Sequence, residues 1–363
     1  MGGALLATLS SCKDDLDLDK FPTGTAYTLS NQASGNQVIQ YLRLGDGSLR
    51  RHGSFATGGA GTGAGLGSQG ALVVSTNGRW VFAVNAGSSE VSVLEVFGLT
   101  LSLNDIVSSG GTTPISLTQY GPWLYVLNAG GSGNITGFTI GSGGHLSPIP
   151  NSTRALSSPT AGPAQIQFSH NGQALIVTEK NTNTISTFLI DANGVAGTLK
   201  THPAAGQTPF GFALGHQGHF YVSEAWGGAV NQSTLSSYAI DAAGNVTTLD
   251  GPDPTNQTAA CWVVTTDDGK LVYTTNTGSG SVSGFRVDGT GMLDLLSPDG
   301  ISGSTGPEST PIDAALSKNS RYLYVLEAGS HAISSYRINK NGSLSQVDEK
   351  TGLPVGAVGL ATR

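Results

Sequence analysis

Short apolar segments separated by polar turns recur along almost the whole chain at a nearly fixed spacing. One clear copy has an apolar segment at 312–316, an aromatic-rich segment at 321–326, an alternating segment at 332–338 and a short apolar segment from 344. Apolar segments of this length, rich in β-branched and aromatic residues, predict β-strands rather than helices. Each copy of the pattern therefore predicts four short strands.

Six complete copies align without gaps inside their strands. The second strand of each copy reads WVFAV, WLYVL, ALIVT, HFYVS, LVYTT or YLYVL, and the third reads VSVLEV, ITGFTI, ISTFLI, LSSYAI, VSGFRV or ISSYRI. The turns at Gly78 and Ser320 lie five copies apart, which gives a period of about 48 residues. A four-stranded unit that repeats with this period is typical of a β-propeller blade with generous loops.

The two ends of the chain supply a seventh copy. Residues 26–49 match the second, third and fourth strands of a copy, and residues 356–362 match a first strand with nothing after it. We therefore predict an all-β, seven-bladed β-propeller of four-stranded antiparallel blades, in which both termini form the last blade. Closure of the ring removes the open sheet edges that favour aggregation. Residues 25–363 are predicted to be one propeller domain, preceded by a leader and tether at 1–24.

Composition and charge narrow the range of partners. The 363 residues include 53 glycines, which suits a chain rich in turns, and only 11% of residues are charged, with a net charge of −7. No cluster of Lys and Arg is present, so we expect no nucleic-acid partner. No apolar run approaches the length of a membrane span. We expect a monomer that binds a small molecule.

The first residues resemble an export signal. A short apolar run at 4–9 leads into Leu-Ser-Ser-Cys ending at Cys12, which resembles a bacterial lipobox, and the acidic stretch 13–17 resembles a lipoprotein tether. This resemblance implies lipidation of Cys12 and a periplasmic or outer-membrane lipoprotein of a Gram-negative bacterium. No Lys or Arg precedes the apolar run, so the alternative is a tail with an incidental cysteine. Cys261, beside Trp262, is predicted to be a buried structural thiol.

Proline precedes several of the predicted first strands, at Pro114, Pro163, Pro209 and Pro311. Together with the aligned strands, this pattern resembles the lactonase-type seven-bladed propellers, which include the 6-phosphogluconolactonase-like proteins and the 3-carboxymuconate-lactonising enzyme. The resemblance covers about residues 25–362 and implies a hydrolase that opens a small lactone. The alternative is a non-catalytic exported propeller that binds a ligand, a glycan or a protein.

One segment departs from the 6-phosphogluconolactonase-like pattern. Those relatives carry a His-x-His type segment at the start of one first strand, whereas the corresponding residues 162–167 here contain no histidine. His170 falls in the following turn, on the opposite face of the predicted ring. A basic pocket for a sugar phosphate is also hard to find among so few Lys and Arg. The sequence therefore argues against a phosphorylated substrate.

The residue that ends each second strand should lie on one rim of the ring, together with the loops that precede the first strands. These residues are Asn31, Asn85, Asn128, Glu179, Glu224, Asn276 and Glu327. We predict Glu179, Glu224 and Glu327 as catalytic residues, because crowding of three carboxylates should raise at least one pKa toward the range of a general acid or base. Either Glu179 or Glu224 could activate water.

The remaining predicted rim residues would bind the substrate or donate hydrogen bonds to it. They are Asn31, Asn85, Asn128, Gln165, Trp226, Asn276, Arg154 and His202. The competing interpretation is structural, because Asn and Glu at strand ends commonly bond the backbone of their own loop. We expect no cofactor, although Ca²⁺ held by Glu and Asn oxygens at the channel mouth is an alternative. The glycine-rich segment 58–70 is interpreted as a flexible connection between blades.

Overall fold

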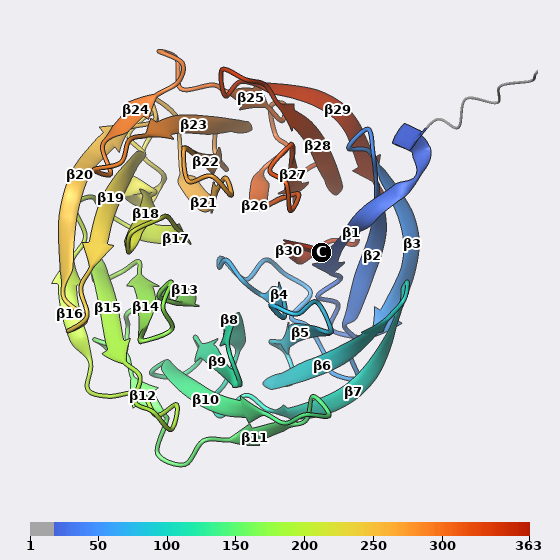
Figure 1. The fold of residues 1–363 in the computed structure, drawn as a ribbon, viewed down its shortest axis with the longest axis vertical. Coiled ribbons are helices and arrows are strands. Elements are labelled where there is room, and N and C mark those ends of the chain that lie inside the picture. The colour runs from blue at the N-terminus through green and yellow to red at the C-terminus, as the bar shows by residue number, and fades with distance from the viewer. Residues whose placement is uncertain (1–17) are drawn as a thin grey trace, which may run out of the picture.

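Seven antiparallel sheets stand around a central axis in the computed structural model, which describes residues 18–363 (Figure 1). In each sheet four strands lie side by side, in order from the axis to the outside. In two sheets a short extra strand also pairs with the third strand. Apart from two 3₁₀ turns, η1 (Leu18–Lys20) and η2 (Trp226–Gly228), no helix occurs in the described residues. The predicted seven-bladed propeller of four-stranded blades is confirmed.

Six blades follow one another along the chain. Blade 1 holds β4 (Leu72–Val74), β5 (Trp80–Asn85), β6 (Glu90–Phe97) and β7 (Thr100–Ser108). Blade 2 holds β8 (Pro114–Tyr120), β9 (Trp123–Asn128), β10 (Asn134–Ile140), β11 (Leu146–Pro148) and the extra β12 (Arg154–Ala155). Blade 3 holds β13 (Pro163–Phe168), β14 (Ala174–Glu179), β15 (Thr184–Leu189) and β16 (Lys200–Pro203).

The next three blades repeat this order. Blade 4 holds β17 (Pro209–Leu214), β18 (His219–Glu224), β19 (Thr234–Ile240) and β20 (Val246–Pro254). Blade 5 holds β21 (Ala260–Thr265), β22 (Leu271–Asn276), β23 (Ser281–Val287), β24 (Leu293–Leu295) and the extra β25 (Gly303–Ser304). Blade 6 holds β26 (Pro311–Leu316), β27 (Tyr322–Glu327), β28 (Ala332–Ile338) and β29 (Leu344–Thr351).

Both ends of the described chain build blade 7, as predicted. Its strands are β30 (Val358–Thr362), β1 (Pro22–Leu29), β2 (Gln37–Leu44) and β3 (Leu49–Ala56). The sheet order β3-β2-β1-β30 places the last strand of the chain innermost, beside β1 (Figure 1). Strand β1 begins slightly before residue 25, where the sequence suggested that the propeller starts.

The hydrophobic core lies between neighbouring blades. All six residues of β5, β14 and β27 are buried, because a second strand has strand neighbours at both edges and another blade against each face. The outermost strands, such as β7 and β29, consist mostly of exposed and partly buried residues instead. Buried tyrosines also link adjacent blades. The hydroxyls of Tyr125 and Tyr273 donate to the carbonyls of Gly194 (2.7 Å) and Gly342 (2.8 Å).

The strand order gives the ring two distinct faces. We call the face where the first strands begin, and where the second strands end, the upper face. The opposite face, where the first strands end in tight turns, is the lower face. At this lower side a turn glycine packs against the aromatic ring of the preceding blade. Gly144, at φ +81°, has Trp80 so close that an added Cβ would lie 2.6 Å from the ring.

We expect deletion of residues 356–363 to destabilise the protein severely. The deletion removes β30, exposes the edge of β1 and leaves the channel side of blade 7 without Val358 and Leu360, which are both buried. The expected loss of unfolding free energy exceeds about 4 kcal/mol. The substitution Leu360→Ala should cost about 2–3 kcal/mol, and chemical denaturation measures both changes.

The matched control for this experiment is Val355→Ala. Val355 is 69% exposed and lies just before the deleted segment. Its truncation should change the unfolding free energy by no more than about 0.5 kcal/mol. A shortened protein that unfolds at the wild-type denaturant midpoint would contradict the closure of the ring by β30.

Candidate functional site

The seven residues predicted to end the second strands lie inside the blades. Six of them do end a second strand, whereas Asn31 lies two residues after the end of β1. Their exposed fractions are 0–1%, although all seven occupy the upper face at equivalent positions. In blades 3, 4 and 6 the residue is a glutamate, and it faces the first residue of the first strand on one side and of the third strand on the other. The structure therefore arranges these residues in a ring without opening their side chains to solvent.

A serine on the third strand is the recurrent partner of these residues. The bonds are Asn85 to Ser92 (2.7 Å), Glu179 to Ser186 (2.7 Å), Glu224 to Ser236 (2.9 Å) and Asn276 to Ser283 (2.8 Å). Each pair satisfies two buried polar groups at the upper end of one blade. This pairing explains why the third strand of most copies keeps a serine near its start. Asn31 donates to the carbonyl of Ala64 (2.6 Å), and Asn128 donates to the carbonyl of Ser109 (3.2 Å) and to Asn134, the first residue of β10 (2.8 Å).

Glu224 is one of two rim glutamates whose carboxylates accept four hydrogen bonds. Its carboxylate accepts hydrogen bonds from the hydroxyls of Thr234 (2.6 Å), Ser236 (2.9 Å) and Tyr238 (3.1 Å) and from the backbone N–H of Gly206 (3.2 Å). Burial raises the pKa of this carboxyl, and the four donors partly offset that effect.

Glu179 also accepts four hydrogen bonds. They come from the backbone N–H (3.2 Å) and the hydroxyl of Ser157 and from the hydroxyls of Thr182 (3.1 Å) and Ser186 (2.7 Å). One oxygen of Glu327 accepts from Ser330 (2.5 Å), and a side-chain hydrogen bond with Ser334 of the third strand also acts to lower its pKa. Burial raises the pKa of Glu327, and the nearby charge of Glu349 adds to the rise.

The expected cause of these raised pKa values was wrong. We predicted that the three rim carboxylates would crowd one another. For Glu224 and Glu327 the largest cause is burial instead, and neither pKa is shifted by another rim glutamate. Each carboxyl lies within its own blade, so the ring spaces the charges apart.

Three of the other predicted substrate-binding residues lie away from the channel. Arg154 is in β12, beside the third strand of blade 2, and donates to the carbonyls of Gly197 (2.9 Å) and Asn151 (2.7 Å). His202 is in β16, the outermost strand of blade 3, within 3.3 Å of the Thr187 hydroxyl. Trp226, in η2, donates to Thr234 (2.9 Å). Their roles in binding stay predictions.

The glycine-rich segment 58–70 crosses the upper mouth of the channel. The side-chain amide of Gln69 bonds both backbone groups of Val263 in blade 5, at 2.8 and 3.0 Å. Trp262 donates to the carbonyl of Ser68 (2.9 Å), and Lys180 of blade 3 donates to that of Gly67 (2.8 Å). The segment is therefore more than a connection between blades, because it ties together blades on several sides of the channel.

Apolar side chains fill the channel beneath this segment. The rings of Phe210 and Trp262 lie 4.8 Å apart, and the ammonium of Lys180 lies 4.9 Å from the Phe210 ring centre. Ile312 packs against the same cluster, which includes the buried Cys261. Burial raises the pKa of the Cys261 thiol to about 12, so it is inert as a nucleophile, as predicted. The upper mouth is therefore closed.

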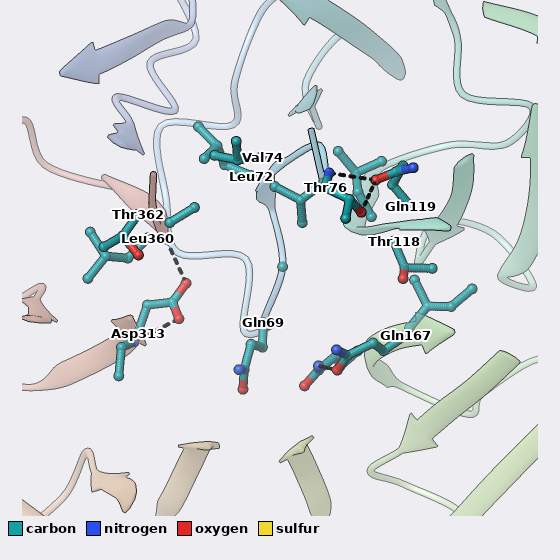
Figure 2. Close-up of a pocket in the computed structure, with 17 residues that line it drawn as sticks. Gln69, Leu72, Val74, Thr76, Thr118, Gln119, Gln167, Asp313, Leu360 and Thr362 are labelled. Atoms are coloured by element: carbon teal, nitrogen blue, oxygen red, sulfur yellow. Dashed lines mark hydrogen bonds between the residues drawn. The ribbon is translucent and has the colours of Figure 1, made fainter. Parts of the chain in front are cut away.

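A polar cavity of about 350 Å³ occupies the channel on the lower side of this cluster (Figure 2). Its walls come from β4, β8, β13, β26 and β30, and Gln69 contributes from the glycine-rich segment. The polar side chains that line it are Gln69, Thr76, Thr118, Gln119, Gln165, Gln167, Asp313 and Thr362. Of the residues predicted for the site, Gln165 is the one that lines this cavity.

Two glutamines of β13 illustrate how the wall is built. The amide of Gln165 pairs with both backbone groups of Phe212 in blade 4, at 2.7 and 2.9 Å, and also donates to Gln167 (3.1 Å). Gln167 itself points toward the open centre, opposite Asp313 and beside Gln69 (Figure 2). These glutamines fall in the segment 162–167, where the sequence departs from the histidine-containing pattern.

Asp313 is the carboxyl in the cavity wall. It is 2% exposed, and its two oxygens accept hydrogen bonds from the backbone N–H groups of Ala314 (2.8 Å) and Leu360 (3.0 Å) (Figure 2). Burial raises its pKa well above the usual range, although both N–H groups act in the opposite direction. Sequence reasoning missed Asp313. The available signal was its position two residues after Pro311, where other first strands have Ser116, Gln165 or Gly211.

The described part of the chain contains no group of three His, Cys, Asp or Glu side chains that could hold a metal ion. Between residues 18 and 363, no helix is both long and apolar enough to cross a membrane. Cys12, the predicted lipidation site, lies outside the described residues.

Solved structures with the same fold include several bacterial proteins. A putative 6-phosphogluconolactonase from Bacteroides fragilis is 19% identical, with a TM-score of 0.70 over 94% of this chain and 98% of its own. The periplasmic gluconolactonase of Pseudomonas aeruginosa is 16% identical, with a TM-score of 0.70 over 92% and 98%. A Lactobacillus plantarum protein is 16% identical, with a TM-score of 0.75 over 94% and 100%. At these identities the likeness shows the fold alone.

A search of curated proteins found no match. A family model described as "Lactonase, 7-bladed beta-propeller" matches residues 145–226 and 216–347, which together make up more than half of the chain. These matched segments run from blade 2 to blade 6 and include both β13 and β26. The chain therefore belongs to the lactonase family of seven-bladed β-propellers.

Proposed function

We propose that the protein opens a small, uncharged lactone by hydrolysis in the channel cavity. The observation that carries this proposal is a cavity of about 350 Å³ whose wall combines neutral amides and hydroxyls with one carboxyl, Asp313. This volume falls within the range of about 300–1,000 Å³ that is usual for small-molecule sites. Membership of the lactonase family supports the choice of reaction.

The reaction needs a nucleophilic water, a proton carrier and a donor to the developing oxyanion. The water oxygen bonds to the lactone carbonyl carbon and the ring C–O bond breaks. The departing ring oxygen takes a proton from the proton carrier, and the carrier regains one from the attacking water. We assign the proton transfer to Asp313, because its raised pKa favours a protonated carboxyl that can donate. We assign the contact with the oxyanion to the side-chain amide of Gln167, which points into the cavity.

The absence of cationic side chains from the cavity wall supports an uncharged substrate. No Lys, Arg or His is among the described residues that line it. A phosphate group would lose its hydration there without gaining a cationic partner. We therefore favour an unphosphorylated lactone over 6-phosphogluconolactone.

The rim glutamates remain the competing candidates for the acid–base group. Chemistry at Glu179 or Glu224 would require the upper mouth to open and both carboxyls to leave their hydrogen-bonded partners. Neither carboxyl lines the channel cavity, whereas Asp313 does, and this difference favours a structural role for the two glutamates. If no lactone is opened at either place, the remaining function is binding without catalysis.

We also propose that the protein is exported and anchored through a lipid on Cys12. A lipobox-like sequence ends at that residue, and one structural neighbour is named a periplasmic gluconolactonase. Mass spectrometry of the protein from membranes should find a lipid-modified N-terminal Cys12. An unmodified peptide that spans residue 12 would contradict the anchor.

Asp313→Asn should lower kcat/KM for glucono-1,5-lactone by about 10²–10⁴-fold, because the variant cannot transfer a proton. Initial rates on a panel of lactones measure this, and the phosphorylated lactone should be the poorer substrate by at least about tenfold. Asp250→Asn is the matched control. Asp250 likewise accepts a backbone N–H of the next blade, from Leu293 at 2.7 Å, but lies away from the channel.

Glu179→Gln and Glu224→Gln complete the same experiment. If either variant loses activity while Asp313→Asn keeps it, the chemistry belongs to the upper rim and the channel assignment is wrong. If the wild-type protein opens no lactone of the panel, hydrolysis itself is excluded for these substrates.

Asp313→Asn should also change how stability depends on pH. Because the folded protein raises the pKa of Asp313, the stability linked to this group is complete below its unfolded pKa and is lost as pH rises through the folded value. The asparagine does not titrate. The unfolding free energy of the variant relative to wild type should therefore rise between pH 4 and pH 8, as measured by denaturant titration. A pH-independent difference would show that Asp313 ionises normally in the fold.

A further inference from the structure

A groove on the lower face adjoins the channel cavity. It has a volume of about 670 Å³ and runs over the lower ends of blades 1 and 2, between their tight turns and residues 140–142. Thr76 and Gln119 line both the groove and the cavity. Gln119 accepts hydrogen bonds from the backbone N–H and the hydroxyl of Thr76, both at 3.0 Å. The two spaces therefore meet at this polar pair.

The groove lies on the side from which the cavity can be reached. Segment 58–70 and the apolar cluster of Phe210 and Trp262 close the upper mouth. The cavity residues Thr76, Gln119 and Thr362 lie at the lower ends of their first strands. A molecule that enters from the lower face therefore reaches the cavity between the ends of these strands, and two of them border the groove.

The groove combines an exposed aromatic ring with polar groups and little free charge. Tyr120 is 39% exposed, and Gly172 of the next blade packs so closely that an added Cβ would lie 2.2 Å from the ring. Gly172 thus packs against the Tyr120 ring, and the exposed part of Tyr120 lines the groove. Arg79 is paired with Glu95 at 3.0 Å and stacks on Trp80 at 4.5 Å, so its charge is already compensated.

We propose that the groove is a second subsite, which binds a neutral sugar unit attached to the lactone that occupies the cavity. The inference rests on one juxtaposition. The polar cavity, which has no cationic side chain, adjoins at Thr76 and Gln119 a groove that is lined by Tyr120. Aromatic rings pack against the C–H faces of sugar rings, while hydroxyl and amide groups bond their hydroxyls. The substrate class is then a lactone of an uncharged disaccharide or longer oligosaccharide.

Other ligand classes fit these surfaces less well. An acyl chain would bury the amides and hydroxyls of the cavity without hydrogen bonds. An anionic ligand would find no uncompensated cation among the described lining residues of either space. A free monosaccharide lactone would fill the cavity and leave the Tyr120 ring uncovered.

Kinetics on the full-length protein test the second subsite. The substrates are glucono-1,5-lactone and two disaccharide lactones, cellobiono-1,5-lactone and maltobiono-1,5-lactone. We expect kcat/KM for at least one disaccharide lactone to exceed that for gluconolactone by tenfold or more. Tyr120→Ala should lower this ratio about tenfold. Phe97→Ala is the control, because Phe97 is 80% exposed on β6, outside the groove and the cavity, and it should leave the ratio unchanged.

The inference rests on the proposed function for the lactone ring, but the two can fail separately. If gluconolactone is opened and the wild-type ratio is near one for both disaccharide lactones, the subsite is overturned and the proposed function stands. The wild-type ratio decides this even if Tyr120→Ala does not fold.

If no lactone is opened, the proposed function fails and calorimetric titration with cellobiose and maltose decides the subsite. Binding of either sugar that Tyr120→Ala weakens at least fivefold supports it. Absence of binding, or binding that Tyr120→Ala leaves unchanged, overturns it.

Discussion

Pairing between β1 and β30 is the contact on which the rest of the structure depends. Every blade buries both faces of its sheet against neighbours, so the ring must close for any blade to be fully packed. Here the ends of the chain meet in register, with Thr28 opposite Leu360 and Tyr27 opposite Ala361. The closed ring then places every first strand at the axis and the end of every second strand on the upper face. The positions of the upper rim and of the channel cavity both follow from that geometry.

The most regular polar feature of the chain supports this framework. A buried Asn or Glu at the end of a second strand pairs with a serine of the third strand in at least four blades. Buried polar groups that lack partners are costly, so such a pair stabilises the blade that contains it. We therefore propose that this ring of residues, which resembles a converging acid–base site, stabilises the upper ends of the blades. The channel cavity, whose wall varies from blade to blade, is the better place for specificity.

The sequence was sufficient to predict the fold. Its strand pattern repeats at a fixed period and is completed by segments near both termini, and a closed ring of seven blades is the arrangement that fits this pattern. The sequence could not place the site. Whether Glu224 faces the channel or its own blade depends on contacts with Ser236 and Tyr238 that strand periodicity does not specify. The path of segment 58–70 depends on Val263, far along the chain. Asp313 lies in an otherwise apolar strand, so the strand pattern did not distinguish it. Comparison of the second residue after each first-strand proline could have identified it.

The central claim is that ligand chemistry takes place in the lower part of the channel and that the upper rim is structural. The most direct measurement is a crystal structure of the protein with gluconolactam, an unreactive analogue of the lactone. The account predicts the ring between Gln167 and Asp313, within hydrogen-bond distance of both, with segment 58–70 still bonded to Val263. Analogue bound instead beside Glu179 or Glu224, with that segment displaced from the upper mouth, would contradict it.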